Sequence, residues 1–341
     1  MRCAVIGAGA WGTALADLLA RNGHNIVLWA REPDVAESVN GRHENVRFLA
    51  GHTLAPSLRA TTSLANAVAD AEFITYAAPS HVLRVVARES ADGVRASATL
   101  AVASKGIERE SFALMTDVIA SELHGRGVVA LSGPSFAAEV AARQPTAVVA
   151  ASALAENAEL TQRLYSSPEF RVYTHDDVEG VELGGALKNV MAVATGIVEG
   201  LGLGFNSRAA LITRGLAEMT RLGTALGARQ ATFAGLAGIG DLVLTCTGAL
   251  SRNRAVGVEI GKGRSLDEVL AEKETVAEGV VTTQSAYALA ERRDVEMPIV
   301  TAVHRILFDG QDARAAIGQL MSRELRAESD DDRTGSAREE G

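Results

Sequence analysis

Cysteine, proline and long apolar runs are scarce in this sequence of 341 residues. Its two cysteines, Cys3 and Cys246, cannot build a disulfide framework or a cysteine-rich zinc site, which indicates a reducing compartment, and we expect the cytoplasm. No uninterrupted apolar run approaches the ~18 residues of a membrane helix, so we expect no membrane insertion. The 33 glycines, in contrast, exceed ordinary usage and indicate tight turns or close backbone approaches.

Positive charge is also in short supply. Lysine and arginine number 33 against 42 acidic residues, and the net charge of −9 argues against a nucleic-acid-binding surface. An anionic ligand would therefore need a locally basic pocket. The seven histidines lack metal-binding spacing, so we expect no metal site, and the absence of a G-x-S-x-G motif argues against a serine hydrolase.

The chain is long enough for two domains, and its pattern changes near residue 178. Within residues 1–178, short apolar runs alternate with helical patterns, which is typical of a Rossmann-like, doubly wound and mostly parallel α/β sheet. The predicted strands are residues 3–6, 25–29, 73–77, 99–103, 128–131, 147–150 and 170–173. Several are followed by polar or glycine-rich turns, and because ligands bind beyond the carboxyl ends of such strands, we expect these turns to form one binding crevice.

Residues 179–322 favour a second domain that is entirely helical. Long stretches of helical periodicity replace the strand-like runs there. The predicted helices are residues 181–199, 207–226, 251–262, 265–272, 282–292 and 298–308. Residues 323–341 are rich in acidic side chains without apolar periodicity, which predicts a frayed tail with no assigned role.

The first predicted strand runs directly into a glycine motif. Gly7, Gly9 and Gly12 match G-x-G-x-x-G, and the next residues continue as a helix with an apolar face. In the dinucleotide-binding fingerprint, the first glycine makes the tight turn, the second admits the pyrophosphate and the third packs the helix on the strand. The N–H groups at the helix start then hold the anion. The sequence therefore predicts a bound NAD-type cofactor.

Arg31 and Glu32 follow the second predicted strand, where such proteins recognise the ribose of the cofactor. The Arg31 guanidinium would suit the 2′-phosphate of NADPH, whereas the Glu32 carboxylate would accept from the free 2′-hydroxyl of NADH. The sequence favours NADPH with NADH tolerated, and solvation of both side chains is the alternative.

Two lysines stand in positions suited to chemistry. Lys188 lies in an apolar, small-residue stretch at the start of the second domain. If that helix packs across the crevice, desolvation lowers the pKa of the amine and makes it an effective proton donor and acceptor. The alternative is a lysine at a domain interface whose amine simply reaches solvent. Lys105 follows a predicted strand, which favours ligand contact.

Ser251, Arg252 and Asn253 stand at a predicted helix start. A serine cap, backbone N–H groups and a forked guanidinium together suit a phosphate, although a capped surface helix would show the same residues. Asp241 follows two glycines and precedes an apolar run. Its carboxylate could orient a lysine amine, but aspartate is also common in turns.

Taken together, the motifs resemble the bacterial-type NAD(P)-dependent glycerol-3-phosphate dehydrogenases. In order along the chain, they are GAGAWGTALA (7–16), SKGIE (104–108), LSGPSFAAEV (131–140), ELGGALKNVMA (182–192), NSRAALITRGLAEM (206–219), GLAGIGDLVLTCTG (235–248), SRNRAVG (251–257) and VAEGVVT (276–282). The resemblance implies reversible reduction of dihydroxyacetone phosphate to sn-glycerol 3-phosphate with NADPH or NADH, a cytoplasmic step that supplies phospholipid synthesis.

The resemblance also implies a role for individual residues. Lys188 would be the catalytic proton donor, and also the base in the reverse reaction. Substrate contacts would come from Lys105, Gly133, Ser135, Lys188, Asp241, Ser251, Arg252 and Asn253. Cofactor contacts would come from Gly7, Gly9, Ala10, Trp11, Gly12, Arg31, Lys105, Ala137, Arg252, Val276 and Glu278.

Two other functions remain open at this point. Another two-domain reductase with a lysine acid, of the β-hydroxyacid or 6-phosphogluconate dehydrogenase type, would turn over a carboxylated substrate. A non-catalytic NADPH sensor would need the glycine fingerprint but not a desolvated lysine. As partners we expect a small phosphorylated triose and, because closed dimers are common among soluble enzymes, a second copy of the chain in a homodimer.

Overall fold

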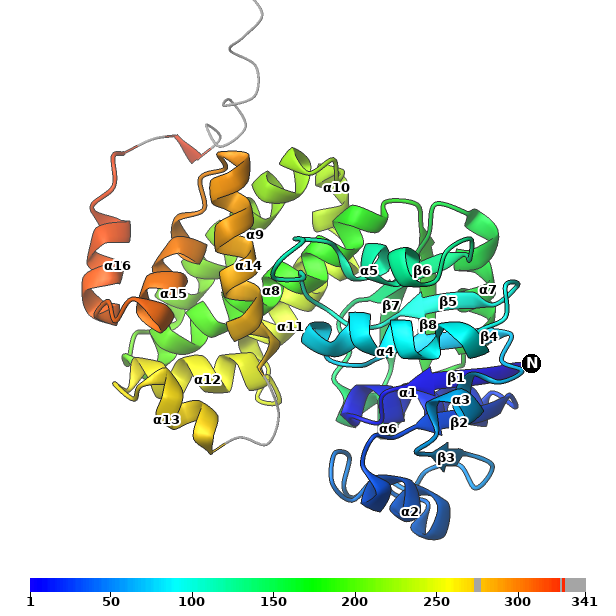
Figure 1. Ribbon diagram of the computed structural model, residues 1–341. Helices are drawn as coiled ribbons and strands as arrows, with labels where there is room; N and C mark the ends of the chain where they lie inside the picture. The colour runs from blue at the N-terminus through cyan, green and yellow to red at the C-terminus, as the bar shows by residue number, and fades with distance from the viewer. Residues whose placement is uncertain (273–276, 326, 329–341) are drawn as a thin grey trace, which may run out of the picture.

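The computed structural model describes residues 1–272, 277–325 and 327–328. A sheet-containing half and a helical half lie side by side, as Figure 1 shows. The last strand ends at His175 and the first helix of the second half begins at Val178. The predicted tail, residues 323–341, falls largely outside the described residues.

One eight-stranded sheet forms the centre of the first half, in the order β3-β2-β1-β4-β5-β6-β7-β8. The strands are β1 (Arg2–Ile6), β2 (Asn25–Trp29), β3 (Arg59–Thr61), β4 (Phe73–Tyr76), β5 (Thr99–Val102), β6 (Val128–Ser132), β7 (Thr146–Ala151) and β8 (Phe170–His175). All neighbouring strands pair in parallel except β6 and β7, which are antiparallel. The predicted mostly parallel, Rossmann-like sheet is therefore confirmed.

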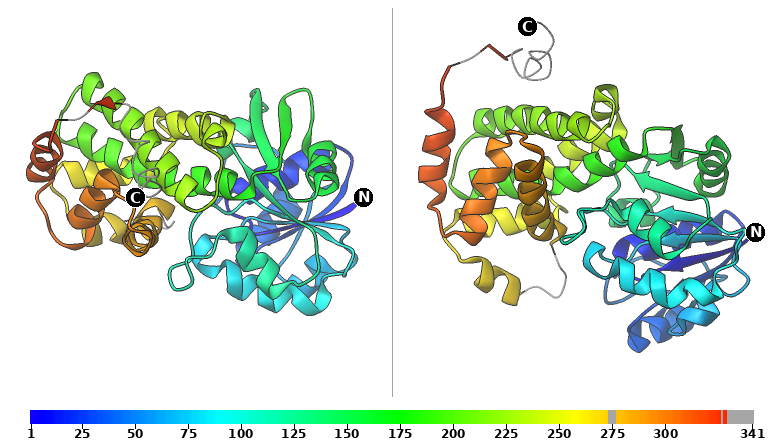
Figure 2. Two further views of the ribbon diagram at one scale, coloured as in Figure 1. Left: turned by 90° about the horizontal axis from the view of Figure 1, so that it is seen from above. Right: turned by 45° about the horizontal axis from the view of Figure 1, so that its top comes forward.

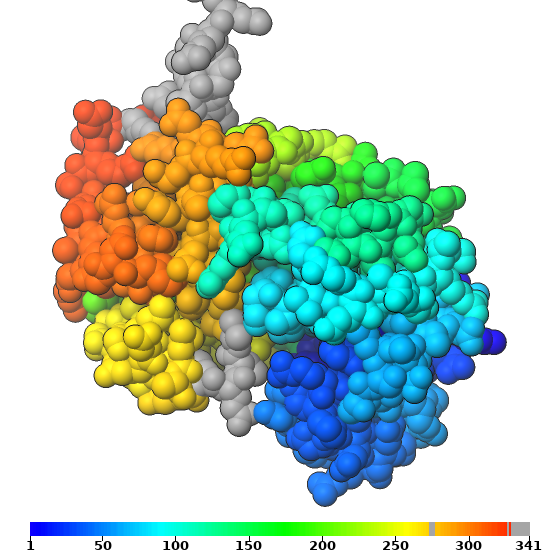
Figure 3. Space-filling view, viewed as in Figure 1, coloured from blue at the N-terminus to red at the C-terminus, as the bar shows by residue number. Residues whose placement is uncertain are grey.

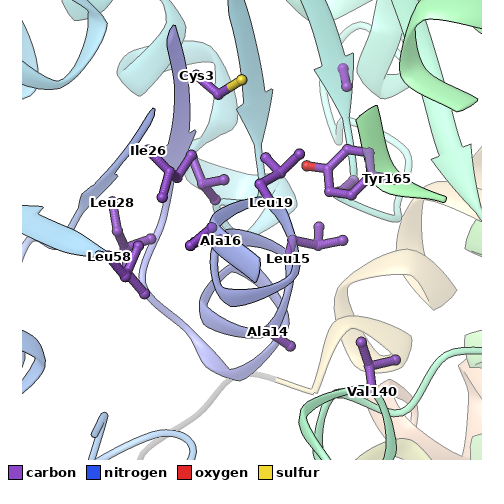
Figure 4. Packing of buried hydrophobic residues seen from close by; sticks show 14 of the residues in the cluster. Cys3, Ala14, Leu15, Ala16, Leu19, Ile26, Leu28, Leu58, Val140 and Tyr165 are labelled. Atoms are coloured by element: carbon purple, nitrogen blue, oxygen red, sulfur yellow. The ribbon is translucent and has the colours of Figure 1, made fainter. Parts of the chain in front are cut away.

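Helices cover both faces of this sheet, because successive strand residues point to opposite sides. They are α1 (Ala10–Arg21), α2 (Pro33–Arg42), α3 (Leu64–Val68), α4 (Leu83–Ser90), α5 (Met115–Glu122), α6 (Ala137–Ala141) and α7 (Ala155–Tyr165), with short 3-10 turns at η1 (Ser80–Val82) and η2 (Ala91–Gly93). On one face, α1 buries Leu15 and Leu19 against Ile26 and Tyr165, as seen in Figure 4. A second core, on the opposite face, contains residues of α3, α4 and α5. This packing places the amino end of α1 at the carboxyl edge of the sheet.

Among its described residues, the second half contains helices joined by loops and no strand. Its elements are α8 (Val178–Gly200), α9 (Phe205–Ala225), α10 (Gln230–Phe233), the π-helical turn η3 (Leu236–Gly240), α11 (Asp241–Thr247), α12 (Arg252–Gly261), α13 (Leu266–Ala271), α14 (Glu278–Arg293), α15 (Pro298–Phe308) and α16 (Ala313–Met321). Helix α8 is the axis around which the others pack, and the two further views in Figure 2 show it leading from the sheet into the helical half.

Close helix packing around α8 depends on missing side chains. A Cβ added at Gly196 would lie 2.1 Å from the carbonyl oxygen of Arg254, and one added at Gly257 would lie 2.1 Å from that of Val193. Gly200 and Gly261 repeat the same arrangement one turn further on. The glycine excess in the sequence thus serves the α8–α12 interface as well as the turns.

Helix α8 also corrects our expectation about apolar runs. By length and composition it could cross a membrane, so length alone does not exclude a span. Its most apolar 18 residues are nevertheless entirely buried inside the molecule. Such burial is typical of the central helix of a soluble protein, because a membrane helix would present this surface to lipid.

Candidate active site

The three fingerprint glycines have different physical roles at the end of β1. Gly7 has a φ of +116°, and a Cβ there would lie 2.9 Å from the backbone of Ala77. A Cβ on Gly12 would lie 1.9 Å from the carbonyl oxygen of Gly7. Gly9 is exposed and a Cβ there would meet nothing within 4 Å. Tight packing therefore requires Gly7 and Gly12, whereas the space beside Gly9 is open to a ligand.

The start of α1 fits an anionic ligand. Gly9 caps the helix without any side-chain hydrogen bond, so the N–H groups of the first turn remain available to a pyrophosphate. Ala10 and Trp11 open this turn, and the buried indole Nε1 of Trp11 has no hydrogen-bond partner among the described residues. The residues present thus fit the pyrophosphate of a dinucleotide cofactor.

Arg31 lies just beyond β2, where its guanidinium is largely exposed. It pairs with the carboxylate of Glu32 at an N–O distance of 2.8 Å. Glu32 is also the residue that precedes α2. The two groups that favour different ribose substituents are therefore adjacent, and this geometry leaves the cofactor preference a prediction.

Two lysine amines from the two halves of the molecule meet on one carboxylate. Lys105 follows β5 and places its Nζ 2.6 Å from Oδ2 of Asp241. Lys188, on α8, places its Nζ 2.9 Å from Oδ1 of Asp241 and donates to the hydroxyl of Thr245 at 2.7 Å. Asp241 is 1 % exposed. A buried carboxylate is therefore shared by two amines, one from each half of the molecule.

Burial and charge set the protonation of this cluster. Burial is the main cause that lowers the pKa of Lys188 to about 8; Asp241 opposes it and the charge of Lys105 adds to it. Burial alone would raise the pKa of Asp241, but the charges of Lys105 and Lys188 hold it below its ordinary value. Near neutral pH the carboxylate is ionised, and Lys188 can both give and take a proton.

Glycines allow α8 to approach the sheet closely enough to form this cluster. A Cβ on Gly184 would lie 2.4 Å from the carbonyl oxygen of Ala237 in η3, and one on Gly185 would lie 2.5 Å from the hydroxyl of Ser132 at the end of β6. Turn η3 leads directly into α11, whose first residue is Asp241. A π-helical turn is often found at a functional site, and here it positions the shared carboxylate.

The loop after β6 borders the same cluster. Gly133 has a φ of +137°, and its carbonyl oxygen accepts from Nζ of Lys105 at 3.1 Å and from the hydroxyl of Ser135 at 2.9 Å. Ala137 begins α6, which packs beside α1. The loop after β6 therefore runs from the lysine cluster to the helix that follows the glycine turn.

Helix α12 supplies the other predicted substrate residues. Ser251 caps the helix by accepting from the N–H of Arg254 at 3.2 Å. The buried Asn253 donates to the side chain of Asn189, next to Lys188, at 2.8 Å and accepts from the N–H of Gly279 at 2.9 Å. Arg252 is exposed, and no described residue pairs with its guanidinium. Asn253 thus joins α8, α12 and α14, while Arg252 remains available to an anion.

Glu278 opens α14 and reaches across to the first half of the molecule. Its carboxylate accepts from the N–H of Ser80 at 3.1 Å and from the hydroxyl of Ser80 at 2.5 Å. Ser80 follows β4, at the same edge of the sheet as the glycine turn. The predicted cofactor contact Val276 lies outside the described residues.

Sequence reasoning missed three residues that the structure places in this region. Thr245 stands four residues after Asp241, a spacing that puts both side chains on one face of α11. Asn189 directly follows Lys188, and Ser80 follows a predicted strand. Helical spacing was sufficient to find Thr245, but the contact between Ser80 and Glu278 joins residues 198 apart and has no local signature.

A nucleotide-binding sheet joined to a helical half that supplies a buried lysine defines a two-domain, dinucleotide-dependent oxidoreductase. Figure 3 shows the helical half, with α12 and α13 in yellow and α14 and α15 in orange, beside the sheet-containing half in blue and cyan. Two family models match the chain: the N-terminus of NAD-dependent glycerol-3-phosphate dehydrogenase over residues 2–158 and its C-terminus over residues 177–318. The chain belongs to the NAD-dependent glycerol-3-phosphate dehydrogenase family, and is an NAD(P)-dependent oxidoreductase.

Individual relatives agree with this assignment. The chain is 54% identical over 330 residues to glycerol-3-phosphate dehydrogenase [NAD(P)+] of Geobacter sulfurreducens, covering 96% of this chain and 98% of the relative. It is 49% identical to the enzyme of the same name from Nitratidesulfovibrio vulgaris, covering 96% and 100%. The crystal structure of glycerol-3-phosphate dehydrogenase from Coxiella burnetii is similar with a TM-score of 0.91 at 40% identity, covering 94% of this chain and 99% of that one.

Proposed function

We propose that this protein reversibly reduces dihydroxyacetone phosphate to sn-glycerol 3-phosphate with NADPH or NADH and so supplies the glycerol backbone of phospholipids. The observation that carries the proposal is the buried amine of Lys188, held on Asp241 where the helical half meets the carboxyl edge of the nucleotide-binding sheet. Family membership identifies the reaction class, and this amine is the group that the reaction needs beside the carbonyl.

The reduction requires a hydride and a proton. The bound cofactor supplies the hydride to the ketone carbon. Negative charge grows on the ketone oxygen, where the Lys188 ammonium stabilises it and transfers its proton from Nζ. In the reverse direction, the neutral amine takes the hydroxyl proton back. Asp241 and Thr245 hold Nζ by hydrogen bonds of 2.9 and 2.7 Å, which fixes the direction of transfer.

Binding of the phosphate orients the ketone. We assign this role to Arg252, with Ser251 and Asn253 at the start of α12, because the guanidinium has no partner among the described residues. Gly133 and Ser135 border the lysine cluster on the side of Lys105. Binding energy at the phosphate, away from the reacting carbon, is then used to align the carbonyl with Lys188.

The nucleotide occupies the turn Gly7–Gly12 in this proposal, with Arg31 or Glu32 at its ribose. Ala137 and Glu278 lie at the edges of the same crevice. A carboxylated substrate, as in the related reductases with a lysine acid, would need another anchor than a phosphate site. We also propose that the enzyme acts in the cytoplasm, as the scarcity of cysteine suggests, and that it forms a homodimer, as is common among soluble enzymes.

Substitution of Lys188 tests the proposal. Lys188→Ala should lower kcat for dihydroxyacetone phosphate by at least about 10²-fold, because the proposed proton donor is removed, while NADPH binding is retained. NADPH oxidation is followed at the nicotinamide absorbance band, and cofactor binding by fluorescence titration. The control is Lys262→Ala, since this lysine is exposed and pairs with Glu259 far along α12. Near-normal turnover by Lys188→Ala would remove the amine from the mechanism.

A further inference from the structure

A second buried acid on α8 has no part in the chemistry described above. Glu182 is 8 % exposed, and its Oε1 accepts from the N–H of Thr116 at 2.9 Å, while Oε2 accepts from the hydroxyl of the same residue. Thr116 lies in the first turn of α5, in the sheet-containing half. The pair therefore crosses between the two halves of the molecule with both carboxylate oxygens occupied.

The loop that carries Lys105 leads to Thr116 by a short path. Residues 107 and 114 pair as an isolated β-bridge, which closes the segment between them into a compact loop. Arg84 holds that loop through a two-pronged contact with Glu108 at 2.8 and 2.7 Å. Across the bridge, only a few residues separate Lys105 from Thr116, so a displacement of Thr116 would have a short path to Lys105.

The same loop is embedded in the core of the helical half. Ile107 is 1 % exposed and packs with residues of α8, including Leu183 and Leu187, although it belongs to the sheet-containing half by sequence. Phe112 and Leu114 pack against the same core. By its packing, this loop therefore belongs with the helices of the second half.

On the other side of the contact, Glu182 and Lys188 share one continuous helix. Six residues separate them, or about 9 Å along the axis. Helix α8 is buried on every side here, so its position relative to α5 fixes where the Lys188 amine lies. The Glu182–Thr116 contact thus joins the two elements that carry the two lysines on Asp241.

We propose that Glu182 and Thr116 are positioning residues, which set the spacing of Lys105 and Lys188 across Asp241 for the reaction. The inference rests on the proposed function for its kinetic consequence, but its geometric consequence can be measured separately. Since a displacement of about 1 Å can lower a rate by about 10²-fold, a small shift of α8 relative to the loop is enough to affect turnover.

The chain offers a matched control for this role. Glu218 is also buried, and it accepts from the N–H groups of Ile299 at 2.7 Å and Val300 at 3.3 Å in the first turn of α15. Both acids therefore hold the start of another helix, and burial raises the pKa of each to about 7. Only Glu182, however, bridges to the loop of Lys105.

The experiment compares Glu182→Ala, Glu182→Gln and Glu218→Ala in the full chain. We expect Glu182→Ala to lower kcat about tenfold or more, with KM for NADPH within about twofold of wild type. Glutamine can still accept the Thr116 N–H and can donate to its hydroxyl, so Glu182→Gln should recover kcat to within about threefold. Glu218→Ala should lose thermal stability but keep kcat. Equal losses of kcat in the two alanine variants, or none in Glu182→Ala, would overturn the inference.

Two further measurements keep the test decisive. If Glu182→Ala fails to fold, Thr116→Val removes only the hydroxyl contact and should lower kcat, whereas Thr116→Ser should not. Crystal structures answer the question without any turnover: in Glu182→Ala or Thr116→Val, one lysine amine should move beyond about 4 Å from the Asp241 carboxylate. Unmoved amines would contradict the positioning role. A wild-type enzyme that is inactive with dihydroxyacetone phosphate would instead contradict the proposed function alone.

Discussion

Two opposing effects set the pKa of the Lys188 amine. Burial favours the neutral amine, and Asp241 favours the charged one, so that the pKa of Lys188 is lowered to about 8 and no further. Without the carboxylate, burial would lower the pKa of the amine further and leave less of it protonated to donate, whereas an exposed amine would hold its proton too firmly to act as a base. The apolar stretch around residue 188 made this behaviour predictable, and the four-residue spacing from Asp241 was sufficient to indicate Thr245 as a second partner.

Cofactor preference is a question at the scale of a single side chain. Arg31→Ala should raise KM for NADPH about tenfold while KM for NADH changes little, because the exposed guanidinium would lose a charge-assisted contact with the 2′-phosphate. The measurement is initial rates with each cofactor at saturating dihydroxyacetone phosphate. Glu32→Gln is the companion variant and should affect NADH more. Equal changes of KM for both cofactors in Arg31→Ala would argue against a 2′-phosphate contact.

Among the structural elements, the sheet was largely predictable and its exceptions have physical causes. Seven strands were expected within a few residues of their observed positions, since buried strands appear as apolar runs. The edge strand β3 was missed because it has three residues, among them Arg59 and Thr61. The antiparallel direction of β7 was not detectable, because a strand buried on both faces has the same apolar pattern in either direction.

Six helices of the second half were predicted from sequence, and four other helical elements were not. The periodicity identified α8, α9, α12, α13, α14 and α15, whereas α16 was not named. In contrast, α10, η3 and α11 follow one another between residues 230 and 247, where glycines hide the helical pattern. Turn η3 and α11 place the carboxylate that both lysines share, so the site could not be assembled from sequence alone.

A pair of glycine substitutions tests how closely α8 and α12 must pack. Gly257→Ala should lower the free energy of unfolding by about 1–3 kcal/mol, since its Cβ would lie 2.1 Å from the carbonyl oxygen of Val193. Gly318→Ala, in α16, meets nothing within 4 Å and should instead raise it by roughly 0.5–1 kcal/mol through helix propensity. Urea denaturation of both variants measures the difference. Similar free energies of unfolding for the two variants would show that α8 and α12 can move apart without loss of stability.

At the scale of the whole molecule, buried acids make stability depend on pH. Burial raises the pKa of Glu182 and Glu218 to about 7 from 4.5, so the folded chain binds more protons than the unfolded chain between these values. Stability from these two groups is therefore complete below about pH 4.5 and is lost as pH rises through about 7. His24, whose pKa is lowered mainly by burial, acts in the opposite direction near its ordinary value of 6.5.

Glu218→Gln isolates this contribution, because the substitution removes one titrating group and keeps the shape of the side chain. Between pH 5 and 7, the difference in unfolding free energy between wild type and variant should change by at most about 1.4 kcal/mol per pH unit. Wild type should become less stable relative to the variant as pH rises. Chemical denaturation at several pH values gives this difference. A difference that does not vary with pH would mean that the Glu218 carboxyl titrates at its ordinary pKa.

One carboxylate between two amines also determines which molecules the crevice attracts. With both lysines protonated, the cluster of Lys105, Lys188 and Asp241 has a surplus of one positive charge, enclosed where water cannot offset it. The cluster is therefore locally positive on a protein whose overall charge is −9. An anionic metabolite would be attracted to this surplus charge, whereas a cationic compound of the same size would be repelled by it.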